Sequence, residues 1–179
     1  MDLMRLCPSK AVSAEEAVSQ IKSGSRVFIG TGCGEPQHLL YPDTFPINLS
    51  SDDFLLNCFL SAPVCARPHL KGKLIIFRPI CPRFPNFFSS QRIGLDVALV
   101  QVSPPDKFGY WSLGVSVDIT RSGLENARLV IAQVNPLMPR TWGDSFVHVD
   151  EIDWLVPHEE PLVEIMPEEK DNEIARRIG

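Results

Sequence analysis

Two apolar runs, each followed by a loop rich in proline and polar residues, dominate the pattern of the chain between positions 95 and 153. Residues 97–102 (VALVQV) and 129–134 (LVIAQV) are apolar almost throughout, which is typical of parallel strands that are covered on both faces. The segments that follow them, residues 103–110 (SPPDKFGY) and 135–142 (NPLMPRTW), cannot continue a strand. Because ligand sites in open α/β sheets lie beyond the carboxyl ends of strands, we expect a functional site in these two loops.

The amino-terminal region predicts a helix, a strand, a glycine-rich loop and a second helix. Residues 13–16 (SAEE) have the form of a capping box, and apolar residues follow at helical spacing as far as Gly24, which is expected to end the helix. Residues 26–30 (RVFIG) predict a short buried strand that enters the loop 31–37, and a helix is expected to open at residues 38–40. This order indicates an α/β fold with a mostly parallel sheet flanked by helices.

The middle of the chain, residues 41–91, is interrupted by prolines. Only residues 54–60 (FLLNCFL) and 74–77 (LIIF) have the pattern of strands. A proline inside a helix costs about 3 kcal/mol, which excludes a long helix across most of this region. We expect poorly regular structure here, disordered in part, and a fold that is incomplete around residues 41–91.

The remaining elements are predicted to be short. A helix capped by Asp118 or Thr120 is expected to run through Ala127, before the second apolar run. Strands are expected from residue 146 to 149, from 152 to 156 and from 162 to 165, followed by a charged, mildly helical segment from 168 to 178. The chain is therefore predicted to form a single domain over residues 1–179.

Composition and charge narrow the class of protein. A chain of 179 residues with 44% hydrophobic residues can bury a core. A net charge of −5 argues against a general nucleic-acid binder, and no apolar run has the length of a membrane span. The amino terminus lacks the apolar core of a secretion signal, so a cytosolic protein is expected. The cysteines form no CxxC pair, so neither a disulfide framework nor a metal site is predicted.

The glycine-rich loop, GTGCGEPQ, allows two interpretations. Its backbone amides and the following helix could bind an anion, or its glycines could serve only a tight turn. No Gly-Lys-Ser/Thr follows, and the third glycine of a dinucleotide fingerprint would fall at Gln37. Glu35 could act as a general base or nucleophile, but an ordinary carboxylate near a helix start is the favoured interpretation.

The two later loops also carry alternatives. The segment SPPDKFGYWSLG could form the wall of a small-molecule pocket or a hydrophobic cover on the sheet. Arg140 could bind a carboxylate or phosphate of a ligand, or form a salt bridge to Asp144 or Asp118, which is the favoured interpretation. His148 is expected to be a core histidine, and the other three histidines have no partner that suggests a catalytic triad.

The segments DVALVQVSPPDKFGYWSLGVSVD and ENARLVIAQVNPLMPRTWGDSFVHVDEID resemble the acetyl-CoA hydrolase/transferase family, which includes acetate and 4-hydroxybutyrate CoA-transferases. The segment SAEEAVSQIKSGSRVFIGTGCGEPQHLL is similar to the opening of the same family. The resemblance implies a CoA-transferase fold with two similar halves in the complete enzyme. It also implies a ping-pong reaction in which a glutamate attacks an acyl-CoA and carries CoA as a glutamyl thioester. In hydrolase members, water intercepts that intermediate.

Two departures from the family pattern limit what the resemblance transfers. The family's catalytic glutamate and main CoA-binding loop belong to the second half, and no residue here matches the motif of that glutamate. We therefore assign no catalytic residue, do not identify Glu35 with that glutamate, and expect the chain alone to be inactive. Residues 166–179 are expected to begin the link to the absent catalytic domain. Family members also carry extra sequence near residues 74–79, whose loss would expose a sheet edge.

The resulting hypothesis is the amino-terminal domain of an enzyme that moves CoA between an acyl-CoA and a short-chain carboxylate, with CoA as substrate and no tightly bound cofactor. Its expected partners are a carboxy-terminal catalytic half and those substrates, and association with a second copy is left open. A non-catalytic remnant or partner-binding domain is the alternative, and an independent nucleotide-binding module ranks lowest because the fingerprint spacing is absent. The residues expected to line the substrate cleft are Gly32, Gly34, Glu35, Pro36, Gln37, Ser103, Pro104, Tyr110, Asn135 and Arg140.

Overall fold

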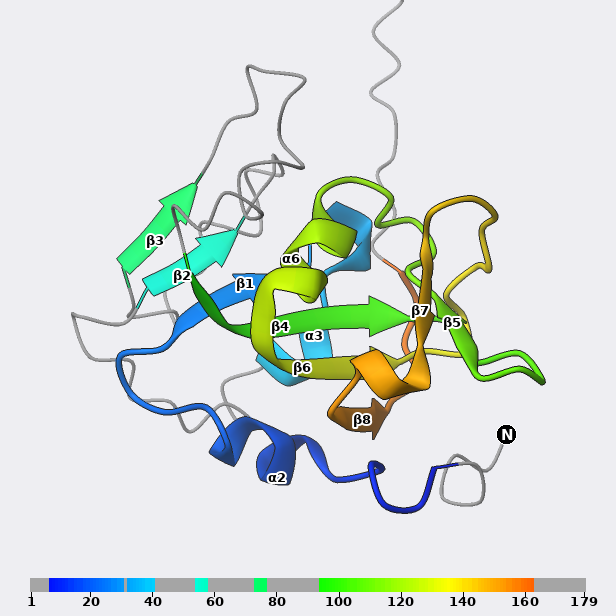
Figure 1. The fold of residues 1–179 in the computed structure, drawn as a ribbon, viewed down its shortest axis with the longest axis horizontal. Helices are drawn as coiled ribbons and strands as arrows, with labels where there is room; N and C mark the ends of the chain where they lie inside the picture. Colours follow the sequence, from blue (N-terminus) through cyan, green and yellow to red (C-terminus); the bar gives the residue numbers. More distant parts are fainter. Residues whose placement is uncertain (1–6, 31, 41–53, 58–72, 77–93, 163–179) are drawn as a thin grey trace, which may run out of the picture.

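A six-stranded parallel sheet organises the chain (Figure 1). The computed structural model describes residues 7–30, 32–40, 54–57, 73–76 and 94–162. The sheet has the order β3-β2-β1-β4-β6-β8, and each neighbouring pair is parallel. Its strands are β1 (Arg26–Ile29), β2 (Phe54–Asn57), β3 (Lys73–Ile76), β4 (Leu95–Val102), β6 (Ala127–Val134) and β8 (Trp154–Pro157). The predicted α/β fold with a mostly parallel sheet is confirmed.

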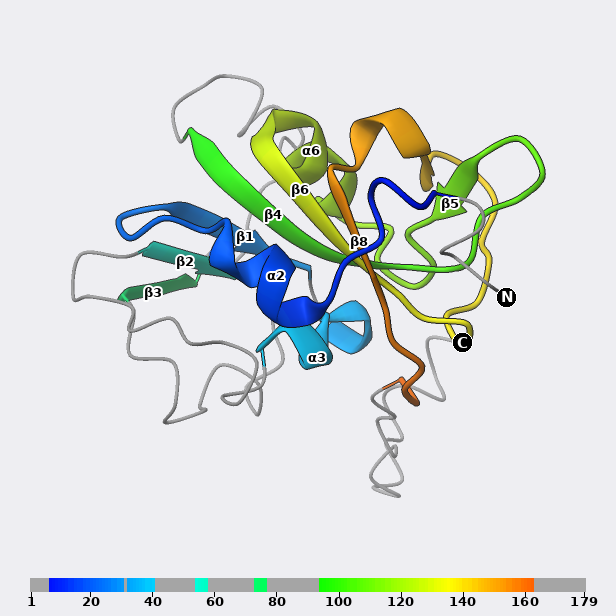
Figure 2. The ribbon, with the colours of Figure 1, turned by 90° about the horizontal axis from the view of Figure 1, so that it is seen from below.

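Helices cover both faces of the sheet (Figure 2). Alternate side chains of β4 face opposite sides, so Val100 and Val102 join one core cluster while Val97 and Leu99 join the other. The first cluster lies under α6 (Thr120–Asn126), and the second lies against α2 (Ala14–Ser19) and α3 (Gln37–Leu40). Burial on both faces explains why VALVQV and LVIAQV are apolar at nearly every position.

The first helix, α2, begins where the sequence predicts it. Ser13 is the N-cap, and its hydroxyl accepts a hydrogen bond from the Glu16 backbone N–H at 3.1 Å. The helix ends at Ser19, earlier than the predicted stop at Gly24, because Ile21 N–H bonds to the Val18 carbonyl three residues back and tightens the last turn. Gly24, with a φ of +83°, forms the turn that leads into β1.

Both strand-like runs in the proline-rich middle form strands. The run at 54–60 contains β2, and the run at 74–77 overlaps β3, so the sheet continues outward from β1 through both. The expectation of irregular or partly disordered structure concerns residues 41–53, 58–72 and 77–91, which lie outside the described residues. The predicted strand from 162 to 165 and the segment from 166 to 179 lie almost entirely outside them as well.

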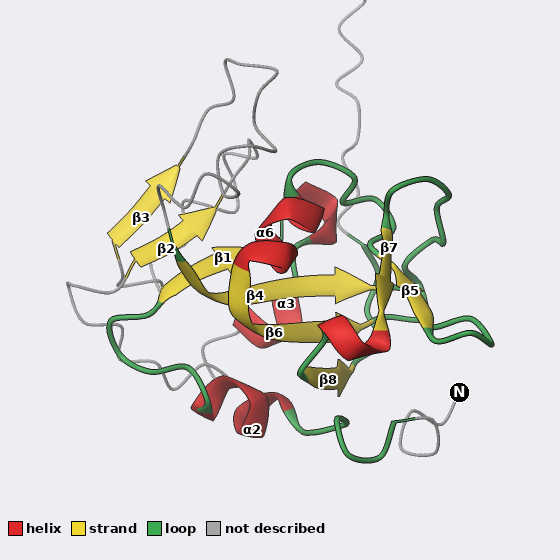
Figure 3. Ribbon diagram, viewed as in Figure 1, coloured by secondary structure: helices red, strands yellow, loops and turns green. Residues whose placement is uncertain are grey.

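A second, two-stranded antiparallel sheet stands beyond the ends of β4 and β6 (Figure 3). It pairs β5 (Tyr110–Ser112) with β7 (Phe146–His148), and a short 3-10 turn (Val149–Glu151) leads from it to β8. The strand predicted at 146–149 is thus present, and the loop after β4 ends one residue earlier than expected, because Gly109 (φ +84°) turns the chain into β5. Trp111, fully buried in this small sheet, closes the end of the first core cluster.

The N-cap of α6 is Ile119, so the predicted cap at Asp118 or Thr120 was wrong, and the helix ends at Asn126 because Ala127 begins β6. Asp118 accepts hydrogen bonds from the backbone N–H of Thr120 at 2.9 Å and from its hydroxyl at 2.7 Å, which orders the turn that enters the helix.

The α6 helix packs closely on the sheet through a glycine. A Cβ placed on Gly123 would lie 2.9 Å from the ring of Phe28 in β1. The glycine therefore sets how near the helix approaches the sheet.

We predict that Gly123→Ala lowers the free energy of unfolding by about 1–2 kcal/mol, because overpacking against Phe28 outweighs the roughly 1 kcal/mol gain in helix propensity. Glu125→Ala, at an exposed position of the same helix, is the control and is expected to change stability by less than about 0.5 kcal/mol, because its ion pair with Arg121 is exposed to solvent. Urea denaturation measures both variants. A stabilised Gly123→Ala variant would contradict the close packing of α6 on Phe28.

Candidate functional site

The sheet reverses its direction of growth between β1 and β4. From β1 the chain builds outward through β2 to β3, and it then returns to the other side of β1 with β4 and continues through β6 to β8. The loop after β1 and the loop after β4 consequently leave neighbouring strands in different directions. This is the position in open α/β sheets where crevices for ligands form, and it places the glycine-rich loop beside the segment that begins at Ser103.

The glycines of the loop after β1 are required by close packing. A Cβ on Gly34 would lie 2.0 Å from the hydroxyl oxygen of Ser116, and a Cβ on Gly30 would lie 3.3 Å from the Gly34 carbonyl oxygen. Gly32, with a φ of +59°, opens the 3-10 turn Gly32–Gly34. These contacts account for the glycines as a tight turn, which was one of the two interpretations of the sequence. The helix that follows, α3, has four residues.

A buried chain of amide side chains crosses the carboxyl edge of the sheet. Gln101 in β4 donates from Nε2 to the Glu35 carbonyl oxygen at 2.9 Å, and its Oε1 accepts from Asn135 Nδ2 at 2.8 Å. Gln133 lies beside Gln101 in register on β6, and its Nε2 donates to the Glu160 carboxylate. Sequence reasoning did not select Gln101, Gln133 or Glu160. The recurrence of glutamine at the same place in VALVQV and LVIAQV was the available signal.

Asn135 is the centre of this network. Its side chain is fully buried, and Nδ2 also donates to the Glu160 carbonyl oxygen at 2.7 Å. Its Oδ1 accepts from the backbone N–H of Leu137 at 3.0 Å and of Glu160 at 3.3 Å. One side chain thereby holds the start of the loop after β6 and the segment that follows β8.

A pair of histidines packs beside the network. The rings of His38 in α3 and His158 after β8 are stacked, with centroids 3.6 Å apart and planes 5° from parallel. His158 Nε2 lies 3.7 Å from a Glu160 carboxylate oxygen. Burial and the neighbouring His158 lower the pKa of His38, although Glu160 and Glu15 oppose the shift. Among the described residues, no group of three or more His, Cys, Asp or Glu side chains could hold a metal ion.

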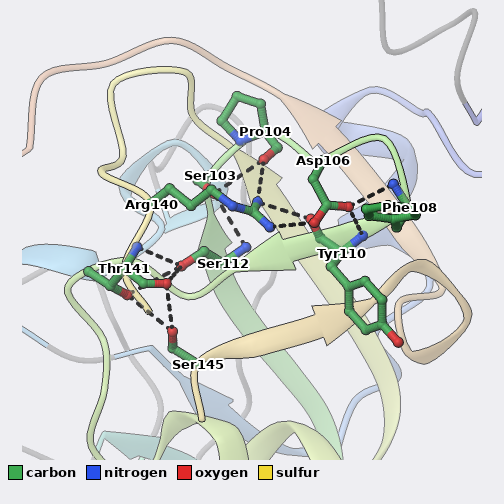
Figure 4. Close-up of polar contacts among 9 residues, drawn as sticks. All are labelled: Ser103, Pro104, Asp106, Phe108, Tyr110, Ser112, Arg140, Thr141 and Ser145. Carbon is green, nitrogen blue, oxygen red and sulfur yellow. Dashed lines mark hydrogen bonds and ion pairs between the residues drawn. The ribbon is translucent and has the colours of Figure 1, made fainter. Parts of the chain in front are cut away.

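Arg140 ties the loop after β6 to the loop after β4 (Figure 4). Its guanidinium forms an ion pair with Asp106 at 2.8 Å and donates to the Tyr110 carbonyl at 3.1 Å and the Pro104 carbonyl at 3.3 Å. The predicted salt bridge therefore exists, but the named partners, Asp144 and Asp118, were wrong.

The Asp106 carboxylate has further partners within its own loop. It accepts from the backbone N–H groups of Tyr110 at 3.0 Å and Phe108 at 2.9 Å. The Tyr110 hydrogen bond is the largest of the influences that lower the pKa of Asp106, and the charge of Arg140 acts in the same direction. An ionised Asp106 thus holds both the turn and the arginine.

Hydroxyl groups connect the same loops on the other side of Arg140 (Figure 4). Ser112 Oγ accepts from the backbone N–H of Gly114 and of Thr141, both at 3.1 Å. Thr141 Oγ1 donates to the Gly114 carbonyl at 2.8 Å, and Ser103 Oγ accepts from the Ser112 N–H at 3.3 Å. Ser103, Ser112 and Thr141 therefore hold the backbone of the loops in place.

The ten residues predicted to line the cleft lie in the segments that follow β1, β4 and β6. They differ in how far each is exposed to solvent. Gly34, Glu35, Pro36, Ser103 and Asn135 are buried. Gly32, Gln37 and Pro104 are half-buried, and Tyr110 and Arg140 are exposed. His148 was expected in the core and instead lies half-exposed on β7, where its Nδ1 accepts from the Asp150 N–H at 3.4 Å and its ring faces Tyr110 edge-on.

Comparison with known proteins assigns this arrangement to a family. Residues 68–167 match the model of the acetyl-CoA hydrolase/transferase N-terminal domain. The whole chain aligns at 35% identity with 46% of a 4-hydroxybutyrate coenzyme A transferase of Clostridium kluyveri. Similarly, 96% of it aligns at 28% identity with 40% of a succinyl-CoA:acetate/propanoyl-CoA:succinate CoA transferase of Fasciola hepatica.

The fold agrees with a solved structure. A crystal structure of 4-hydroxybutyrate CoA-transferase from Porphyromonas gingivalis superposes with a TM-score of 0.75 and 28% identity, covering 93% of this chain and 43% of that one. The chain spans less than half the length of the curated relatives it matches. No helix in the described ranges is long and apolar enough to cross a membrane.

We predict that Asn135→Ala lowers the free energy of unfolding by about 2–4 kcal/mol, because each buried polar group left without a partner costs about 1–3 kcal/mol. Asn126→Ala is the matched control, since the half-buried Asn126 makes one hydrogen bond, to the Ser122 carbonyl. It is expected to cost less than about 1.5 kcal/mol. Equal losses for the two variants in urea denaturation would contradict the central role of Asn135.

The histidine pair predicts a pH dependence of stability. Because the pKa of His38 is lower in the folded chain than the ordinary value of 6.5, the unfolded chain takes up the proton first as pH falls. The stability that depends on neutral His38 is therefore complete above pH 6.5 and is lost as pH falls through the folded pKa. We expect His38→Phe and His38→Gln each to flatten the decline in urea midpoint on acidification. An unchanged decline in both would contradict this assignment.

Proposed function

Because the chain belongs to the acetyl-CoA hydrolase/transferase family, whose amino-terminal domain it matches over residues 68–167, we propose that it forms the amino-terminal domain of an enzyme that moves CoA between an acyl-CoA and a short-chain carboxylate. The observation that carries the proposal is the alignment of all its residues with 46% of a 4-hydroxybutyrate coenzyme A transferase. The proposed substrates are acyl-CoA and a small carboxylate such as acetate or 4-hydroxybutyrate. The expected cytosolic location is part of the proposal.

In this proposal the domain supplies one wall of the substrate cleft. The wall consists of the glycine-rich loop, the loop from Ser103 to Gly109 and the loop after β6, which follow the neighbouring strands β1, β4 and β6 at the carboxyl edge of the sheet. The half-buried residues of the wall, which reach its surface, are Gly32, Gln37 and Pro104. Ser103 and Asn135 support the wall from within, since both are buried.

Arg140 has a supporting role in the same wall. Its guanidinium is already neutralised by Asp106 and bonded to two backbone carbonyls. An arginine held in this way positions a loop and does not need an anionic ligand to satisfy its charge. The proposal therefore assigns binding of the CoA phosphates to the other half of the enzyme.

The reacting group in the proposal is a glutamate of the carboxy-terminal half. Its carboxylate attacks the thioester carbonyl, the C–S bond breaks, and CoA leaves as a thiolate, which leaves an acyl-glutamyl anhydride on the enzyme. The thiolate attacks the glutamyl carbonyl and expels the acyl group as a carboxylate. The second carboxylate then attacks the glutamyl thioester and releases the CoA thiolate, forming a new anhydride. The thiolate attacks the acyl carbonyl of that anhydride, so the new acyl-CoA leaves and the glutamate is free again. The proposal gives Glu35 no part in this sequence, because its surroundings do not match the motif of the family's catalytic glutamate and the residue is buried within the domain.

Exchange of CoA between acetyl-CoA and 4-hydroxybutyrate tests the proposal. We expect no turnover by this chain alone and measurable turnover when the carboxy-terminal half of the Clostridium kluyveri enzyme is added. That half alone is the control. Turnover by this chain alone would show that it contains the nucleophile. Absence of turnover by the mixture would count against the proposal and favour a non-catalytic, partner-binding domain.

A further inference from the structure

Large apolar side chains are exposed in one part of the described structure. All six of them lie between residues 108 and 142, in the segments that follow β4 and β6: Phe108, Tyr110, Val115, Val117, Leu137 and Trp142. Trp142 is the most exposed, at 87%. Single exposed apolar residues are ordinary on a protein surface, but a concentration on one group of loops indicates a contact surface.

Four of these residues lie on two loops that are joined to each other, and we call them the apolar rim: Val115, Val117, Leu137 and Trp142. Their two loops are joined by the hydrogen bond from Thr141 to the Gly114 carbonyl. Gly114 also packs so closely on Met138 that a Cβ there would lie 2.2 Å from its sulfur atom. The rim is therefore held in place by contacts beneath it.

The rim borders the glycine-rich loop. The nearest methyl carbon of Val115 lies 3.5 Å from the position that a Cβ on Gly34 would occupy. Trp142 projects beside the ring of Phe146, with centroids 5.9 Å apart and planes 81° from parallel, and Arg140 stacks on the same ring at 4.7 Å. Aromatic residues on such a support are typical of the centre of protein interfaces.

The polypeptide leaves the domain at the same edge. After β8 the chain passes α3, where His158 stacks on His38 and Asn135 holds the backbone of Glu160 (Figure 2). A domain that continues from Leu162 thus starts from the edge that carries the rim. The relatives are more than twice as long as the part that aligns with this chain, so their remaining part is large enough to cover a surface of this kind.

We propose that the apolar rim is the surface on which the carboxy-terminal half of the enzyme docks, with Trp142 at its centre. This inference rests on the proposed function, which supplies the second half. Docking there buries the four side chains, and because Val115 lies beside Gly34, the seam between the halves reaches the glycine-rich loop.

Quenching of tryptophan fluorescence by acrylamide tests the proposal. In a Trp154→Phe variant, Trp111 is fully buried and Trp142 is the exposed reporter. We expect strong quenching in this chain alone and several-fold weaker quenching after the carboxy-terminal half of the Clostridium kluyveri enzyme is added. Trp142→Ser should weaken association by about 30-fold, the effect of losing an interface anchor. Phe108→Ser, outside the rim in the loop that Asp106 holds (Figure 4), should change it by less than about threefold.

The outcomes separate this inference from the proposed function. CoA exchange by the mixture with Trp142 still quenched would overturn the docking surface and leave the function intact. Association that shields Trp142 without exchange would support the surface and count against the function. Absence of association would overturn the docking surface. A dimer of this chain alone that shields Trp142 would also overturn it, because a second copy would then occupy the rim.

Discussion

The reversal of the sheet between β1 and β4 is the constraint on which the rest of the structure depends. Two parallel strands that lead to opposite halves of a sheet send their following loops apart, and the polar groups left between them need partners. Gln101 meets this need, since one end of its amide bonds to the Glu35 carbonyl and the other to Asn135. The hydrogen bonds therefore span the point where the loops separate.

The carboxyl edge divides its side chains between support and surface. Amides and hydroxyls such as Asn135, Ser112 and Thr141 point inward and satisfy loop backbone, and Arg140 with Asp106 holds the outer loop. This arrangement uses the polar chemistry of the loops to build a firm scaffold. It agrees with the proposed function, in which this domain shapes one side of a reaction site and another part of the enzyme carries the reacting group.

Sequence reasoning predicted the elements whose pattern is local. The strands β4 and β6 follow from apolar runs, and the start of α2 follows from Ser13. The contacts of the site depended on residues far apart in the chain. Asp106 reaches Arg140 because Gly109 turns the chain back into β5, and His38 meets His158 only across the folded sheet. No spacing rule encodes such pairs.

The end of α2 and the position of His148 show a second limit of the sequence. Apolar spacing continued past Ser19 because Ile21 still packs on the core, although the backbone had already tightened out of the α-helix. His148 follows an apolar residue in a strand, but that strand belongs to the small outer sheet, where one edge meets solvent. A pattern of burial identifies an element more reliably than its boundaries or its neighbours.

The pairing of β1 with β4 has a consequence for the order of folding. The Arg26 backbone N–H donates to the Asp96 carboxylate 70 residues away, so the centre of the sheet closes only when a long intervening segment has been brought round. The pairs β4–β6 and β6–β8 join residues much nearer in the chain, and loop-closure entropy favours contacts of that kind at an early stage. The strands β4, β6 and β8 can thus pair with one another early, and the closure of β1 against β4, which joins the two halves of the sheet, is the late step.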